Sequence, residues 1–134
     1  MSNRNVQEQV LKQFEEDREK AFKKARERLE SIEIKPSENL MQEFADMLLR
    51  LKEKLCKCLE ECPQGLVDNL SGFGVVRAFY LILEEMALME LQKVERVKKK
   101  KEDNDYIREI LIMTMIETVQ DTIDELTPKS ESKP

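Results

Sequence analysis

Apolar residues recur every three or four positions through most of this chain, and the runs are separated by short breaks rich in proline, glycine and charge. That spacing is typical of one face of an α-helix. It predicts four helices, over residues 6–32, 38–62, 74–101 and 105–126. We therefore expect an all-α protein, either a four-helix antiparallel bundle or a three-helix core with a long, highly charged N-terminal helix.

The first predicted helix is the most polar. Twelve of the sixteen residues from Glu15 to Glu30 are charged, and the apolar positions form a thin seam. A helix that is polar almost all round lies in solvent or along a partner. We expect residues 1–35 to form a charged helix that projects from the core or binds a partner, with these residues facing that partner: Phe14, Ala21, Ala25 and Leu29.

The second helix has the cleanest amphipathic pattern. Pro36 disfavours helix at the residue before it, and Ser37 is a favourable N-cap for the helix that follows. Pro63 ends this helix, and all three glycines fall in the loop over residues 63–74. The predicted buried stripe comprises Leu40, Phe44, Met47, Leu48, Leu51, Leu55, Cys58, Leu59 and Cys62.

The third helix is the opposite of the first, since thirteen of the seventeen residues from Val75 to Leu91 are apolar. A helix that is apolar almost all round must be covered by other elements. We expect residues 36–128 to form a helical core and residues 129–134 a disordered tail. The predicted interior of the third and fourth helices includes Phe79, Leu83, Met86, Ile112 and Ile116.

Methionine is frequent on the last three helices and suits irregular or exchangeable surfaces as well as cores. Met86 and Met89 are therefore candidate partner-binding residues in a groove that takes a helix. The alternative is ordinary core filling.

Composition narrows the chemistry that this chain can perform. Histidine is absent, which removes the commonest general base and the commonest metal ligand. The three cysteines, Cys56, Cys58 and Cys62, lie on one predicted helix, where Cys56 points away from the other two. A zinc site needs four ligands, so we interpret Cys58 and Cys62 as small apolar residues. We expect no enzymatic activity, cofactor, metal or small-molecule substrate.

The net charge of −5 argues against a general nucleic-acid binder. The lysine run Lys98, Lys99, Lys100 and Lys101 could still contact an anionic surface, or it could simply offset the helix dipole. The first residues are polar, and no apolar run approaches the ~20 residues of a membrane span. We therefore expect an intracellular protein, cytoplasmic or nuclear, that is neither secreted nor transmembrane.

Two segments resemble the apoptosis-regulating helical bundles typified by B-cell lymphoma proteins. The segment from Met41 to Leu48 is similar to their helix-binding signature, and Phe73-Gly74 is similar to the start of their central helix. Val75 replaces the arginine expected after that glycine, and the tryptophans of the family are missing. The resemblance implies a bundle that captures an amphipathic helix, but we do not assign the chain to this family.

Together these patterns predict a non-enzymatic helical interaction or scaffold subunit of a larger intracellular assembly. Its partner would be another helical protein or a second copy of the chain. One alternative is a regulatory bundle with a methionine-lined groove for a helix. Another is a peripheral adaptor that binds anionic lipid or nucleic acid through Lys93–Lys101, although we consider membrane and nucleic-acid partners disfavoured, since lysines at the end of a helix are commonly solvated and offset its dipole.

Overall fold

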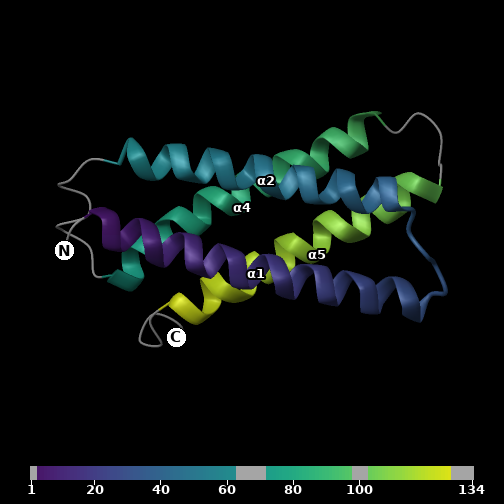
Figure 1. Cartoon of the computed structure of the whole chain (residues 1–134), viewed down its shortest axis with the longest axis horizontal. Helices are drawn as coiled ribbons and strands as arrows, with labels where there is room; N and C mark the ends of the chain where they lie inside the picture. Colours follow the sequence, from purple (N-terminus) through teal and green to yellow (C-terminus); the bar gives the residue numbers. More distant parts are fainter. Residues whose placement is uncertain (1–2, 63–71, 98–102, 128–134) are drawn as a thin grey trace, which may run out of the picture.

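The computed structural model describes residues 3–62, 72–97 and 103–127, and every regular element in these ranges is an α-helix. The helices, labelled as in Figure 1, are α1 (Asn3–Ser31), α2 (Glu38–Glu60), α4 (Gly72–Val97) and α5 (Asp103–Leu126). They correspond to the four helices that apolar periodicity predicts. The all-α prediction is therefore confirmed for the described part of the chain.

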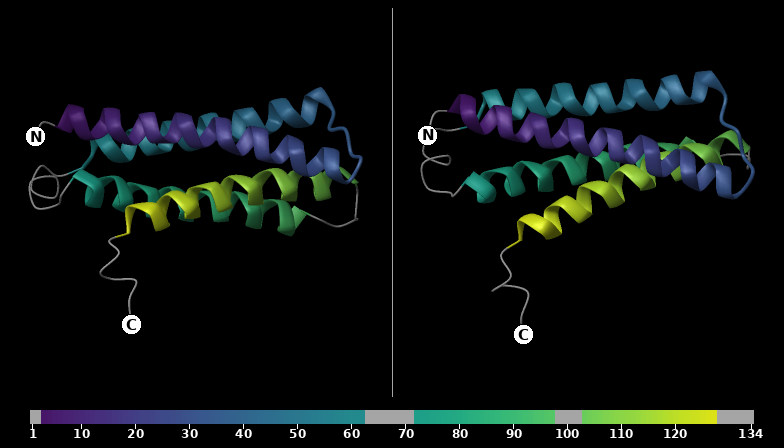
Figure 2. Two further views of the ribbon diagram at one scale, coloured as in Figure 1. Left: turned by 90° about the horizontal axis from the view of Figure 1, so that it is seen from below. Right: turned by 60° about the horizontal axis from the view of Figure 1, so that its bottom comes forward.

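The helices pack as a bundle of two layers, one formed by α1 and α2 and the other by α4 and α5 (Figure 2). Contacts between side chains show how α1 and α5 run relative to each other. Asp17 meets Thr122 and Arg28 meets Thr114, so α1 and α5 run antiparallel. The closest packing joins α4 to α5 and α1 to α5. Each helix therefore has antiparallel neighbours, as short connections favour.

The break between α1 and α2 is built as the sequence predicts. The Ser37 side chain accepts a hydrogen bond from the Leu40 amide at 3.2 Å, which satisfies one free donor at the start of α2. At the end of α1, Glu33 adopts a left-handed φ of 57°. The Ile34 amide then donates to the Leu29 carbonyl at 2.9 Å, which gives the helix a Schellman-type end.

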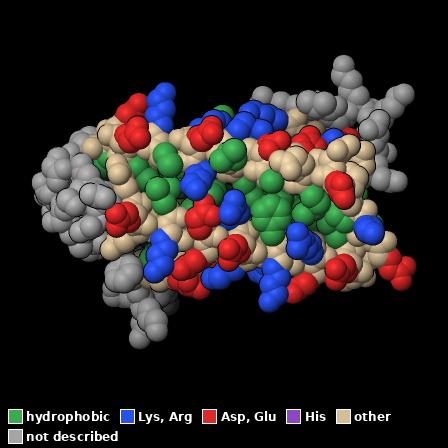
Figure 3. Space-filling model, viewed as in Figure 1, with side chains coloured by type: hydrophobic (Ala, Val, Ile, Leu, Met, Phe, Trp, Pro, Cys, Tyr) green, Lys and Arg blue, Asp and Glu red, His purple; other side chains and the backbone are tan. Residues whose placement is uncertain are grey.

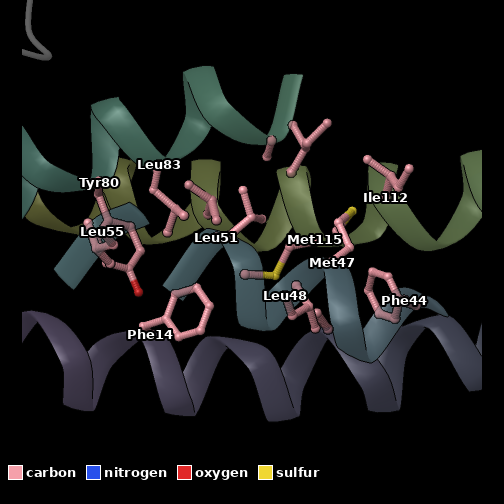
Figure 4. Packing of buried hydrophobic residues seen from close by; sticks show 14 of the residues in the cluster. Phe14, Phe44, Met47, Leu48, Leu51, Leu55, Tyr80, Leu83, Ile112 and Met115 are labelled. Carbon is pink, nitrogen blue, oxygen red and sulfur yellow. The ribbon is translucent and has the colours of Figure 1, made fainter. Parts of the chain in front are cut away.

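One apolar core runs through all four helices. In Figure 4, Phe14 of α1 and Leu51 of α2 lie between the ribbons, opposite Leu83 of α4 and Met115 of α5. The predicted stripe of α2 is buried except for Cys58 and Cys62, which are half-buried at its edge. The interior predictions are confirmed for Phe79, Leu83, Ile112 and Ile116, whereas Met86 is half-buried against the core.

The first helix differs from expectation, because α1 is a full member of the bundle. Six of its apolar residues are almost completely inaccessible, at 0–1% exposed: Val6, Val10, Phe14, Ala21, Ala25 and Leu29. A thin apolar seam is therefore enough to place this helix in the core, while its many charged residues cover the outer surface. The arrangement with a projecting helix over residues 1–35 is not the one observed.

Three predicted features lie wholly or mostly outside the described residues. These are the loop over residues 63–74, of which only the last three are described and belong to α4, the tail over residues 129–134, and the lysines Lys98, Lys99, Lys100 and Lys101.

Candidate interaction surface

Among the described helices, α4 has the largest number of exposed large apolar side chains. Leu81 and Ile82 are each 40% exposed, and Met89 is 57% exposed. Leu81 and Met89 are separated by two steps of four residues, with Glu85 between them, so these side chains share one stripe along the helix. We call Leu81, Ile82, Glu85 and Met89 the α4 ridge.

The acidic residues of α4 differ in their surroundings. Glu90 is buried and accepts weak contacts of 3.4 Å from Arg50 and Lys93. Glu84 and Glu85 make no ion pair with any residue in the described ranges. Arg77, on the same helix, donates to the Thr127 hydroxyl at 3.1 Å. The surface around the ridge therefore combines apolar side chains with two carboxylates that have no ion pair among the described residues.

Of the residues predicted to bind a partner, only Met89 is freely accessible. Met86 packs partly against the core. The other four, Phe14, Ala21, Ala25 and Leu29, are fully buried within this chain. That prediction is corrected, since side chains enclosed by the bundle cannot contact a partner in this fold.

The two alanines of α1 lie on the side of that helix that packs against α5. Thr114, Thr118 and Thr122 follow one another at four-residue intervals on α5 and are all buried. The hydroxyls of Thr114 and Thr118 donate to backbone carbonyls one turn earlier, at 2.6 and 2.8 Å. The alanines of α1 are small, and these two threonines are compact and already hydrogen-bonded within α5. The two helices can therefore approach closely. We call this contact the α1–α5 seam.

Asp17 is the polar centre of the seam. Its buried carboxylate accepts hydrogen bonds from the Thr122 hydroxyl at 2.7 Å and the Gln13 amide at 3.2 Å. Burial raises the pKa of Asp17, although these hydrogen bonds and Lys20 partly oppose that shift. The Tyr80 hydroxyl points toward α1 (Figure 4) and has no hydrogen bond of good geometry among the described residues. Burial and the nearby Asp17 raise the pKa of Tyr80.

Sequence reasoning missed Asp17, although the sequence carries a signal for it. The apolar seam of α1 advances by steps of three or four residues, except for one step of seven between Phe14 and Ala21. Asp17 occupies the missing position, three residues after Phe14. A gap in an otherwise regular stripe therefore marks a buried polar residue.

A narrow cleft opens where α2, α4 and α5 meet. It has a volume of about 80 Å³, below the ~150 Å³ of a cavity that binds benzene. Its apolar lining includes Phe44 and Met47, and the ion pair between Arg108 and Glu43 lies beside it. Among the described residues that line the cleft, Met47 is the single methionine. The cleft is too small for an extended helix.

The remaining surfaces offer little specific chemistry. Figure 3 shows the face formed by α1 and α2, where charged side chains surround scattered apolar ones. Phe22 on this face packs edge-on against Phe44 with ring centroids 5.0 Å apart. Within the described ranges no cluster of acidic or cysteine side chains could hold a metal ion. None of the described helices is both long and apolar enough to cross a bilayer.

Comparisons with known proteins give no relative for this chain. No protein-family model matches it, and neither a curated protein nor a solved structure is significantly similar. The function must therefore be argued from the molecule itself.

Proposed function

We propose that this chain is a non-enzymatic interaction subunit that binds a helical partner through the α4 ridge. One observation carries the proposal: α4 still exposes Leu81, Ile82 and Met89 after three other helices have packed around it. Large apolar side chains gathered on one stripe of a helix are typical of a surface that another element covers.

The shape of the ridge supports a helix as the partner. Its residues lie at intervals that match the apolar face of a helix, and such a stripe pairs with a second helix by interlocking side chains. A protein–protein interface between two globular surfaces uses roughly 20–30 residues on each side. A ridge on one helix provides far fewer, which fits one added helix.

The helix-capturing alternative receives less support from the geometry. It predicts a groove lined by Met86 and Met89, but neither residue lines the cleft where α2, α4 and α5 meet, and that cleft holds about 80 Å³. The adaptor alternative depends on Lys93–Lys101. Within that range Lys93 already contacts Glu90 in the same helix.

Site-specific photo-cross-linking in cells that express the protein naturally would test the proposal. A photoreactive residue replaces Met89 in one variant and Glu53, on the exposed side of α2, in a matched control. We expect a discrete covalent adduct from position 89 that position 53 does not give. The substitution Ile82→Glu in the position-89 variant should abolish the adduct. Equal adducts from both positions, or an adduct that survives Ile82→Glu, would contradict a partner at the ridge.

A further inference from the structure

The charge on the ridge identifies the kind of helix that fits it. We infer that the partner is a basic amphipathic helix, with an apolar stripe and a lysine or arginine opposite Glu85, rather than a second copy of this chain. This inference rests on the proposed function and specifies the partner of the same surface.

Glu85 carries the first step of the argument. It lies between Leu81 and Met89 on the ridge, so a helix that covers these two side chains also passes over the carboxylate. Glu85 has no ion pair in the described structure, and neither has its neighbour Glu84. Covering an acidic side chain without a counter-charge costs free energy, whereas a cation opposite the carboxylate offsets that cost.

The same residue argues against self-association. In a symmetric pair formed along the ridge, the two-fold axis brings the middle of one ridge against the middle of the other. Glu85 would then face its own copy, and like charges opposite each other weaken a helix pair. The other members of the ridge, Leu81, Ile82 and Met89, are uncharged. Lys93, the next residue along the same stripe, already contacts Glu90 and lies about two turns from Glu85. A second copy is therefore a poor occupant.

Binding of designed peptides to the complete chain tests the inference directly. The probe is a helical peptide of about 18 residues with leucine on one face and lysine beside it, long enough to hold a helix on binding. The comparison peptide has glutamate at every lysine position. Fluorescence anisotropy of a label on each peptide measures its affinity, and far-UV circular dichroism checks that each protein variant stays folded.

We expect the lysine peptide to bind at least about tenfold more tightly than the glutamate peptide. Glu85→Lys should weaken the lysine peptide by about fivefold and strengthen the glutamate peptide. Glu53→Lys on the exposed side of α2 makes the same change in net charge and should alter either affinity by less than about twofold. This matched pair separates a local contact from general attraction to an acidic protein.

Four other results would overturn the inference, and they differ in whether the proposed function fails with it. If both peptides bind equally and Met89→Glu abolishes both, the ridge binds helices but does not select basic ones. If Glu85→Lys and Glu53→Lys have equal effects, the selection is not local to the ridge. If Met89→Glu leaves the binding of both peptides unchanged, the peptides do not use the ridge, and the proposed function fails with the inference. A dimer at micromolar concentration that Met89→Glu dissociates would show that a second copy occupies the surface.

Discussion

The α1–α5 seam is buried and the α4 ridge is exposed, which is the opposite of what the composition of each helix suggests. The seam belongs to the most charged helix, yet it is buried and encloses Asp17. The ridge belongs to the most apolar helix, yet Met89 on it is 57% exposed. The contrast teaches that burial in a bundle depends on the residue that lies opposite. Alanine and threonine fit a close contact, whereas an all-round apolar helix has more apolar surface than three neighbours can cover.

The largest effect on stability should come from removing an aromatic ring from α1. Phe14→Ala should lower the free energy of unfolding by about 3–5 kcal/mol, because Phe14 is completely buried. Phe22→Ala on the same helix is the matched control. Phe22 is half-buried, so its loss should be about 1–2 kcal/mol. Urea denaturation followed by circular dichroism measures both. Equal losses would mean that α1 is not held in the bundle as described.

Overfilling the seam should have a smaller effect. Ala25→Leu adds side-chain volume where α1 lies close to α5, and should cost about 1–3 kcal/mol. Ala45→Leu makes the same change at a half-buried position on α2 and should stay within about 0.5 kcal/mol. Thermal unfolding of the two variants checks the difference. A neutral Ala25→Leu would show that the two helices are not tightly apposed.

Asp17 should make stability depend on pH. Its pKa is raised by burial, so the folded state binds this proton more tightly than the unfolded state does. The free energy of unfolding should therefore fall as pH rises from the ordinary carboxyl pKa through the raised value, and should level off above it. Asp17→Asn removes this contribution and offers an amide donor to Tyr80. We expect the variant to gain stability relative to the native protein as pH rises.

Urea denaturation across a pH series measures this effect. Asp121→Asn, on the exposed side of α5, is the control and should keep the native dependence on Asp17. A native pH dependence that persists unchanged in Asp17→Asn would rule out the carboxyl in the seam as its source.

The smallest effect on stability should come from the ridge. Met89→Lys should change the free energy of unfolding by less than about 0.5 kcal/mol, because the side chain is mostly in solvent. The same variant should lose binding to a helical partner. Calorimetry and peptide titration on one preparation test both statements. A large loss of stability would place Met89 in the core and remove the ridge as a binding surface.

Much of the local structure could be predicted. Pro36 and Ser37 mark the start of α2, and regular spacing identifies its buried stripe from Leu40 to Leu59. The way in which α1 ends was harder to predict, because a glutamate at position 33 gives no sign of a left-handed backbone. Of the candidate surface, Met89 was anticipated, but Leu81 and Ile82 could not be separated from the buried residues around them in a helix that is apolar on every side.

The four helices, their breaks and the amphipathic face of α2 can be read from local patterns, since these depend on residues a few positions apart. Which faces are enclosed depends on how the helices pack against one another. Ala21 and Ala25 are buried because the threonines of α5 let two backbones come close, and Leu81 stays exposed because no other helix of the described ranges covers it. Local periodicity states which side chains share a face, but burial requires a partner for that face, and the partner lies far away in the chain.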